Sequence, residues 1–344
     1  MQFPVLCYRA RTRDDWSVTV PTTSRHPRVR RTRAIPRLAI LTGAGASNGA
    51  GDIAPAPPPL SGQLFDELVQ SCPNSWGRLP DATASGFRSD FETAMADLWA
   101  VSSAGSSQLL IDMALYFSSF DPSPAHQKDC YSRLLRALKV NGLIRTTAFA
   151  TLNYECILDV CANRQGLQLA YLGPSPPRNN LLIWKLHGAC NLLPALPIWD
   201  LTVQLVNPTT QSYYDGPVEP VNLVELRRRY SAGYALPPAM SLFAPGKPTP
   251  VATSFIDETR RQWAEWVRHA TAVVVIGVRP VLADTHLWQP IISSKAQVWW
   301  IGTASGLDYD ILSDQLSESR LYPIESLFET SLPWLERTLK EIRA

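Results

Sequence analysis

Residues 37–47 read Arg-Leu-Ala-Ile-Leu-Thr-Gly-Ala-Gly-Ala-Ser, and this stretch decides the fold class. Residues 37–42 predict a short buried strand that ends at a glycine turn. Small residues in such a turn let a pyrophosphate approach the main chain, and the amino end of a following helix favours negative charge. The dinucleotide fingerprint G-x-G-x-x-G is absent, because Asn48 stands where its third glycine would be. The stretch indicates either a phosphate turn of another type or a tight turn without a ligand.

Two later segments put polar side chains at strand ends. Thr151-Leu152-Asn153-Tyr154-Glu155 ends a predicted strand at 147–152, and Lys185-Leu186-His187-Gly188 ends one at 181–186. Carboxyl ends of parallel strands share one sheet edge, so we expect both segments beside the glycine turn. The Asn153 amide suits orienting a ribose hydroxyl or a water. His187, with an ordinary pKa of about 6.5, suits a general base. Taken singly, each residue is more often structural, Asn153 as a turn or N-cap residue and His187 as a strand-end histidine, but their place at one crevice with the glycine turn favours the functional interpretation.

Strand and helix patterns alternate through the rest of the chain. Further strands are predicted at 271–277, 296–301 and 320–325. Helices are predicted at 154–163, 257–269 and 281–289, and a closing helix has the apolar stripe Leu335, Leu339 and Ile342. This alternation predicts an α/β fold, a doubly wound and mostly parallel sheet of the Rossmann-like kind, with helices on both faces.

Two segments interrupt this pattern. Helical spacing at 62–70, 87–101, 106–119 and 125–140 predicts a helical lobe over about 62–140. Residues 53–61 contain four prolines and predict a loop next to the glycine turn. Residues 190–250 are rich in proline without sustained periodicity, which predicts a long irregular insertion.

Charge is unevenly distributed. The net charge is +2, yet residues 1–37 contain nine of the 32 basic residues and only two of the 30 acidic ones. The remaining 23 basic and 28 acidic residues give a body near −5, which does not predict a nucleic-acid surface. Residues 1–36 are interpreted as a flexible basic arm, with a leader or a nucleic-acid or partner-binding arm as alternatives. Pro4, Pro21 and Pro27 disfavour an amphipathic leader.

Composition predicts a cytoplasmic protein with one large domain over residues 37–344. Of 344 residues, 45% are hydrophobic, and no apolar run approaches the roughly 18 residues of a membrane span. Six cysteines occur, at positions 7, 72, 130, 156, 161 and 190, without a Cys-x-x-Cys pair. We therefore expect reduced thiols, no membrane partner and no metal site.

Two further residue groups have open interpretations. Ser47 could bond a phosphate or cap a helix. Asp284 and His286 fit a helix cap with an exposed ring, or a place in the site. His126, His269 and His286 make no metal constellation with one another.

The three segments, in this order, resemble the sirtuin family of NAD-consuming proteins. Sirtuins have Gly-Ala-Gly-x-Ser after a strand, as at 43–47, then Thr-x-Asn-hydrophobic-Asp, matched at 151–155 with Glu155 in the last place. They also have His-Gly at a strand end, as at 187–188. A later strand ends in glycine, as at Gly277, and many bacterial relatives have an Asp soon after, as at Asp284. The resemblance spans roughly residues 37–302.

The resemblance implies NAD as the substrate and gives these residues roles. Asn153 would position the nicotinamide ribose, and His187 would be the base acting on a ribose hydroxyl. The matching positions imply the NAD-binding residues Gly43, Ala44, Gly45, Ser47, Thr151, Glu155, Gly188, Gly277 and Asp284. The family's Pro-Asp-Phe-Arg stretch is missing, since residues 53–56 read Ile-Ala-Pro-Ala.

The reaction that we expect depends on a further difference from the sirtuin family. The four-cysteine zinc module, which builds much of the acyl-lysine peptide cleft in the family's deacylases, is absent. The chain more closely resembles a bacterial branch that destroys NAD in defence against phage, or acts with a partner ATPase. We expect hydrolysis of NAD to nicotinamide and ADP-ribose, gated by homo-oligomerisation, a partner or a trigger. The alternatives are protein deacylation, ADP-ribosyl transfer and a non-catalytic NAD or ADP-ribose sensor.

Overall fold

Among the residues that this computed structural model describes, seven parallel strands form the central sheet, in the order β11-β10-β9-β1-β4-β6-β5. The strands are β1 (Leu38–Thr42), β4 (Thr147–Thr151), β5 (Gln168–Ala170), β6 (Asn180–Lys185), β9 (Ala272–Ile276), β10 (Gln297–Ile301) and β11 (Leu321–Ile324). The structure describes residues 38–101, 103–122, 128–173, 180–195, 214–241, 251–317 and 319–343, all within one unit, residues 34–344. The predicted parallel α/β sheet is confirmed.

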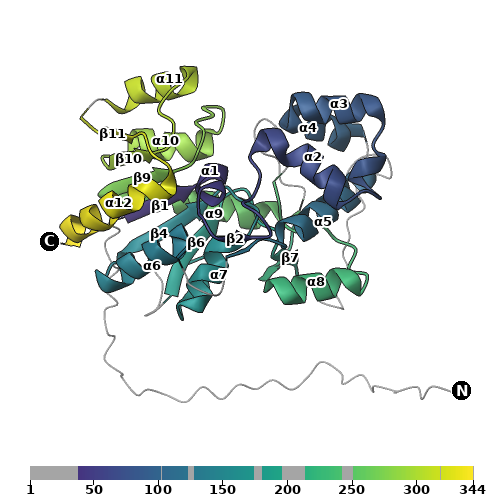
Figure 1. The fold of residues 1–344 in the computed structure, drawn as a ribbon, viewed down its shortest axis with the longest axis horizontal. Coiled ribbons are helices and arrows are strands. Elements are labelled where there is room, and N and C mark those ends of the chain that lie inside the picture. The colour runs from purple at the N-terminus through teal and green to yellow at the C-terminus, as the bar shows by residue number, and fades with distance from the viewer. Residues whose placement is uncertain are drawn as a thin grey trace, which may run out of the picture. The chain divides into compact units, whose positions relative to one another are not determined.

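The five inner strands are buried on both faces, and their residues alternate between two apolar cores, whereas the edge strands β5 and β11 are partly exposed. In β1, Leu38 and Ile40 pack into one core, and Ala39 and Leu41 into the other. The first core takes the apolar faces of α6 (Cys130–Val140), α7 (Ile157–Arg164) and α12 (Phe328–Arg343). The second takes those of α9 (Thr253–His269), α10 (Thr285–Ser293) and α11 (Leu307–Leu316). Figure 1 shows these helices around the sheet, which is therefore a doubly wound, Rossmann-like arrangement.

β1 occupies the point where the strand order reverses. The chain runs from β1 to β4 on one side, and later returns to β9 on the other. Thr42 is in register with both Thr151 and Ile276, so these three strands end at one level. In open α/β sheets, ligands bind outside the carboxyl ends of the strands at such a switch point. The short helix α1 (Ala44–Asn48) starts here.

The helical lobe lies between β1 and β4 in the sequence. It comprises α2 (Ser61–Ser71), α3 (Asp81–Ser89), α4 (Phe91–Val101) and α5 (Ser103–Phe117), with a 3-10 turn at Trp76–Arg78. The rings of Phe65, Trp76, Phe87 and Phe91 pack together in its interior, with centroids 5.0 to 6.2 Å apart. This interior is continuous with the sheet core that contacts α6 and α7.

Two helix boundaries in this region differ from the prediction. The helix expected at 87–101 is two helices, because the Asp90 side chain accepts hydrogen bonds from the N–H groups of Glu92 and Thr93 and caps α4. The helix expected from residue 125 begins at Cys130, where the Asp129 carboxylate accepts from the Ser132 N–H at 2.8 Å. His126 and the arm at 1–36 lie outside the described residues.

The remaining elements are short. β2 (Ile53–Ala54) pairs antiparallel with β3 (Asp121–Pro122), and a second 3-10 turn spans Ile144–Thr146. β7 (Leu192–Pro194) pairs antiparallel with β8 (Val218–Pro220). The insertion predicted to be irregular over 190–250 therefore contains short regular elements in its described parts. A helix, α8 (Leu223–Ser231), also forms there, because the Asn222 side chain caps it by accepting from the Glu225 N–H at 2.9 Å.

Candidate functional site

The glycine turn after β1 packs backbone to backbone against the end of β9. The Gly43 N–H donates to the Ile276 oxygen at 3.0 Å, and the Gly45 N–H donates to the Gly277 oxygen at 2.9 Å. Gly277 has a φ of +59°, and a Cβ atom there would lie 2.1 Å from the Ala46 nitrogen. A side chain at Gly277 would therefore force the two strand ends apart. Close packing at the switch point requires this glycine whatever ligand binds.

The predicted phosphate residues of the turn have different surroundings. Ala44 is exposed, while the N–H groups of Gly43 and Gly45 are committed to the end of β9. Ser47 is 1% exposed, and its hydroxyl bonds to other side chains. Ala44 is thus the turn residue most accessible to a ligand, and Ser47 stabilises the turn through buried hydrogen bonds.

A buried hydrogen-bond network joins this turn to the residues that follow β4. The Asn153 amide nitrogen donates to the Gly43 oxygen at 3.0 Å and to the Ser47 hydroxyl at 2.8 Å. The Ser47 hydroxyl donates to a Glu155 carboxylate oxygen at 2.6 Å. Because the single Ser47 proton is used there, the Tyr131 hydroxyl, 3.0 Å away, is the donor to Ser47. Burial, and then the charge of Glu155, raises the pKa of Tyr131, which keeps this donor protonated.

This network fixes the orientation of the Asn153 side chain. Both hydrogens of its amide nitrogen are used, so the amide oxygen is the atom that remains for a ligand. That oxygen accepts no hydrogen bond from a described residue. Asn153 is also 8% exposed, so part of the residue is accessible to solvent. The arrangement suits an acceptor for a ribose hydroxyl or a water.

Two other predicted residues support Asn153 from within the protein. The Thr151 hydroxyl accepts from the Asn153 backbone N–H at 3.2 Å. The second Glu155 oxygen accepts from the Ile157 N–H at 2.5 Å, at the start of α7. Both residues are buried and their hydrogen bonds are internal. These hydrogen bonds hold the Asn153 segment in position.

His187 lies in a tight turn directly after β6. Gly188 has a φ of +76°, and a Cβ atom there would lie 1.9 Å from the Ala239 oxygen, so only glycine fits. The Ser241 N–H donates to the His187 oxygen at 2.8 Å and holds the turn against residues 239–241. His187 is 6% exposed, and the fixed backbone of the turn limits where its imidazole can lie.

The His187 ring meets a second histidine. Its Nε2 atom lies 3.1 Å from Nε2 of His286, with ring centroids 5.3 Å apart. At this distance one nitrogen must carry a proton and the other must accept it, so the two rings share a single hydrogen. His286 is half-buried, and the interpretation of an exposed ring at a helix cap is wrong. Asp284 occupies the N-cap position of α10, but its side chain makes no capping hydrogen bond.

The histidine pair spans the switch point. His187 follows β6, and His286 lies in α10, which follows β9. In the sheet order, β4 and β1 lie between β6 and β9. The contact between the rings therefore crosses the carboxyl ends of the two strands that lead to Asn153 and to the glycine turn.

Three residues beside His187 were not predicted from the sequence. Arg260 of α9 donates to the Leu186 oxygen at 3.1 Å and to the Ser241 hydroxyl at 3.1 Å. Burial lowers the pKa of Arg260, while the charges of Asp257 and Asp284 oppose this shift. The Tyr154 hydroxyl donates to the Ser241 oxygen at 2.8 Å. Arg260 lies in the run Asp-Glu-Thr-Arg-Arg at 257–261. Such a charged run is typical of a solvent-exposed helix face, so the sequence did not indicate that Arg260 lies beside His187.

A buried ion pair lies beneath this turn. The Lys185 Nζ is 2.6 Å from an Asp159 carboxylate oxygen, with side chains 1% and 5% exposed. The other Asp159 oxygen accepts from the Tyr171 hydroxyl at 2.6 Å. Lys185 also donates to the backbone carbonyl oxygen of Glu155 at 3.3 Å. The pair thus ties α7 and the Asn153 segment to the strand end that precedes His187.

The five cysteines among the described residues are free thiols, and two of them lie beside the site. Cys156 and Cys190 have sulfur atoms 3.7 Å apart. Burial raises the pKa of the Cys156 thiol, which keeps it protonated. Within the described ranges, no group of three His, Cys, Asp or Glu residues is arranged to hold a metal ion.

Fold and site together define an α/β protein of the doubly wound class with a polar, histidine-containing site at the switch point of its sheet. A scan against models of known protein families gives no match, and a search of curated proteins gives none. Among the described helices, none is long and apolar enough to cross a membrane.

Proposed function

We propose that this protein hydrolyses NAD at the bond between nicotinamide and ribose, releasing nicotinamide and ADP-ribose. One observation carries the proposal. Hydrogen bonds join Gly43, Ser47 and Asn153 at the switch point, where the His187–His286 pair crosses the same strand ends. A nucleotide-type glycine turn, an oriented amide oxygen and a histidine base at one sheet edge support chemistry on a dinucleotide.

The proposed reaction assigns each group a step. The C1′–N1 bond breaks, and its electron pair goes to the pyridinium nitrogen, which leaves as neutral nicotinamide. A water oxygen forms the new bond to C1′ and loses one proton to His187. The Asn153 amide oxygen orients the water or a ribose hydroxyl. Because His187 shares a hydrogen with His286, a neutral imidazole is available to accept that proton.

The choice of hydrolysis rests on the sequence. Deacylation and hydrolysis both begin by expelling nicotinamide, so the absence of the four-cysteine peptide-cleft module favours water as the acceptor. On the same resemblance we propose a role in bacterial anti-phage defence, in the cytoplasm. Control would come through a homo-oligomer or an ATPase partner, because a constantly active NAD hydrolase would kill its host.

Product analysis tests the reaction. The protein is incubated with NAD, with and without an acyl-lysine peptide, and nicotinamide and ADP-ribose are separated by chromatography. Both products should form without peptide. Turnover that strictly requires the peptide would indicate a deacylase, and ADP-ribose attached to a macromolecule would indicate a transferase. Binding without turnover would indicate a sensor.

Substitutions test the assigned residues. His187→Ala and Asn153→Ala should each lower nicotinamide release by roughly 10²–10⁴, as expected for a positioned catalytic group, and the double change should be less than additive. His269→Ala is the matched control. It removes an exposed imidazole at the end of α9, which precedes β9 and so lies at the opposite edge of the sheet. Full activity in folded His187→Ala would contradict the proposal.

The mass in solution tests the proposed control. Light scattering should give a multiple of 38.1 kDa under conditions of activity. A fully active monomer would contradict gating by self-association.

A further inference from the structure

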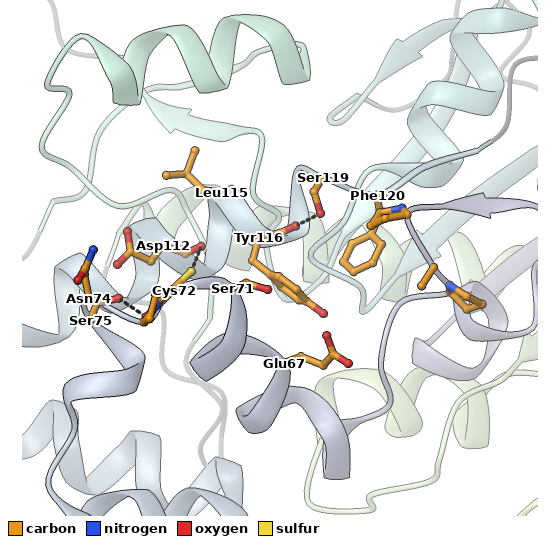
Figure 2. Close-up of a pocket in the computed structure, with 14 residues that line it drawn as sticks. Glu67, Ser71, Cys72, Asn74, Ser75, Asp112, Leu115, Tyr116, Ser119 and Phe120 are labelled. Carbon is orange, nitrogen blue, oxygen red and sulfur yellow. Dashed lines mark hydrogen bonds between the residues drawn. The ribbon is translucent and has the colours of Figure 1, made fainter.

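A cavity of about 570 Å³ opens between the helical lobe and the loop after β2 (Figure 2). Its walls come from the end of α2, the following residues 72–75, the second half of α5 and residues 55–57. This volume lies in the range of roughly 300–1,000 Å³ that is typical of small-molecule sites. None of the residues assigned to the NAD site lines it.

The charge of the lining has a single sign. Glu67 and Asp112 are the ionisable carboxylates of the wall, and the lining contains no Lys, Arg or His. One Asp112 oxygen accepts from the Gln108 amide at 2.9 Å, which leaves the other oxygen for a ligand. Glu67 has no ion pair with any described residue. The cavity therefore repels phosphates and carboxylates and attracts cations.

A nearly buried tyrosine provides a second, independent observation. Tyr116 is 9% exposed, its hydroxyl has no hydrogen-bond partner among the described residues, and in Figure 2 it points into the cavity toward Glu67. Its ring is held edge-on by Phe120, with centroids 5.2 Å apart, and by Phe117 at 5.4 Å. The ring is therefore buried while the hydroxyl lies at the cavity surface, where it can hydrogen-bond a ligand.

The rest of the wall combines apolar and aromatic residues with the uncharged polar residues Ser71, Asn74, Ser75 and Ser119. Phe120 and the prolines at 55, 57 and 73 line the cavity beside Tyr116. Aromatic rings next to carboxylates favour organic cations, because ring faces attract positive charge and the apolar wall accommodates methylene groups. A hydrated metal ion would gain nothing from the aromatic and proline surface.

We propose that this cavity binds a small organic cation with an ammonium or guanidinium group, which pairs with Glu67 and Asp112 and bonds the Tyr116 hydroxyl. The inference does not rest on the proposed NAD chemistry, and its test uses no NAD.

Calorimetry with the full chain at low salt tests the proposal. The probes are agmatine and putrescine, with 1,4-butanediol as a neutral analogue and glutarate as an anionic one. At least one of the two cations should bind, whereas butanediol and glutarate should give no heat. The affinity should fall at high salt, because exposed charge pairs are screened.

Matched variants locate the site. Glu67→Gln and Asp112→Asn should each weaken binding about tenfold or more, and Tyr116→Phe should weaken it less. Asp66→Asn is the control, because Asp66 neighbours Glu67 in sequence but pairs with Arg88 and does not line the cavity. The proposal is overturned if neither cation binds, if butanediol binds equally well, or if Asp66→Asn weakens binding as much as Glu67→Gln.

Discussion

Gly277 shows how one residue fixes the site's geometry. It has a left-handed φ, and a Cβ atom would lie 2.1 Å from the Ala46 nitrogen. Gly51 has a similar φ of +67° with no atom within 4 Å, so it is a matched control. Gly51→Ala should cost about 1–2 kcal/mol for the backbone alone. Gly277→Ala should cost at least about 2 kcal/mol more, through the clash. Urea unfolding measures both, and equal losses would contradict this account of the turn.

Cys72, on the cavity wall, has a predictable reactivity. Burial, and then the charge of Asp112, raises the pKa of the Cys72 thiol to about 11. Relative to a thiol with the ordinary pKa of 9.0, its thiolate fraction at pH 8 should be about 100-fold lower. Alkylation by iodoacetamide should therefore be slow at pH 8 and accelerate up to about pH 11. Peptide mass spectrometry follows the rate, with the urea-unfolded chain as control. Rapid labelling of the native protein at pH 8 would contradict this.

At the scale of residues, the sequence predicted the strand-end positions and not their partners. Asn153 and His187 stand out because each follows an apolar run. The contact of His187 with His286 depends on how α10 crosses the sheet edge, which no local pattern encodes. The contacts of Arg260 beside His187 could not be predicted for the same reason, because they depend on how α9 packs against the sheet.

At the scale of elements, the Lys185–Asp159 pair links β6 to α7. Lys185→Met would leave a buried carboxylate without its cation and should cost about 3–5 kcal/mol. Lys185→Met with Asp159→Leu should cost markedly less, because no unpaired charge remains. Urea unfolding at pH 7 measures both. A Lys185→Met variant as stable as the parent would show that the ion pair contributes nothing to the free energy of unfolding.

The same pair has a defined pH dependence. Burial lowers the pKa of Lys185, but the charge of Asp159 outweighs burial and the pKa is raised overall. A raised lysine pKa stabilises the folded state fully below the unfolded value of about 10.4, and the contribution is lost as the pH rises through the folded value. The stability difference between parent and double variant should be constant near neutral pH and shrink above about pH 10.

Elements with a strong period were predictable, and short or capped ones were not. The inner strands of the sheet were found because they are apolar runs buried on both faces, but the edge strand β5 has only three residues and no such run. α11 has apolar residues without a clear stripe, and the break between α3 and α4 depends on a cap at Asp90. Caps act through single hydrogen bonds, which periodicity does not register.

At the scale of the whole molecule, NAD should stabilise the native state. A ligand at 100 times its dissociation constant stabilises the fold by about 2.7 kcal/mol, which should raise Tm by a few degrees. His187→Ala should keep most of this shift, since the glycine turn remains. EDTA should leave the Tm shift unchanged, because we expect NAD to bind without a metal ion. Differential scanning calorimetry is the measurement, and no shift at saturating NAD would contradict the proposed site.

The central place of β1 also has a consequence during synthesis on the ribosome. β1 is the first of the described strands to be made. Its partner β9 and the Trp266 indole, which bonds the Leu38 oxygen, come far later, and 228 residues separate Leu38 from Trp266. At roughly 5–20 residues per second, that interval lasts about 11–46 s. During it, the apolar sequence Leu-Ala-Ile-Leu-Thr lacks both neighbouring strands until β4 is made, and then still lacks β9. Chaperone protection of the nascent chain should therefore matter most before residue 276 emerges.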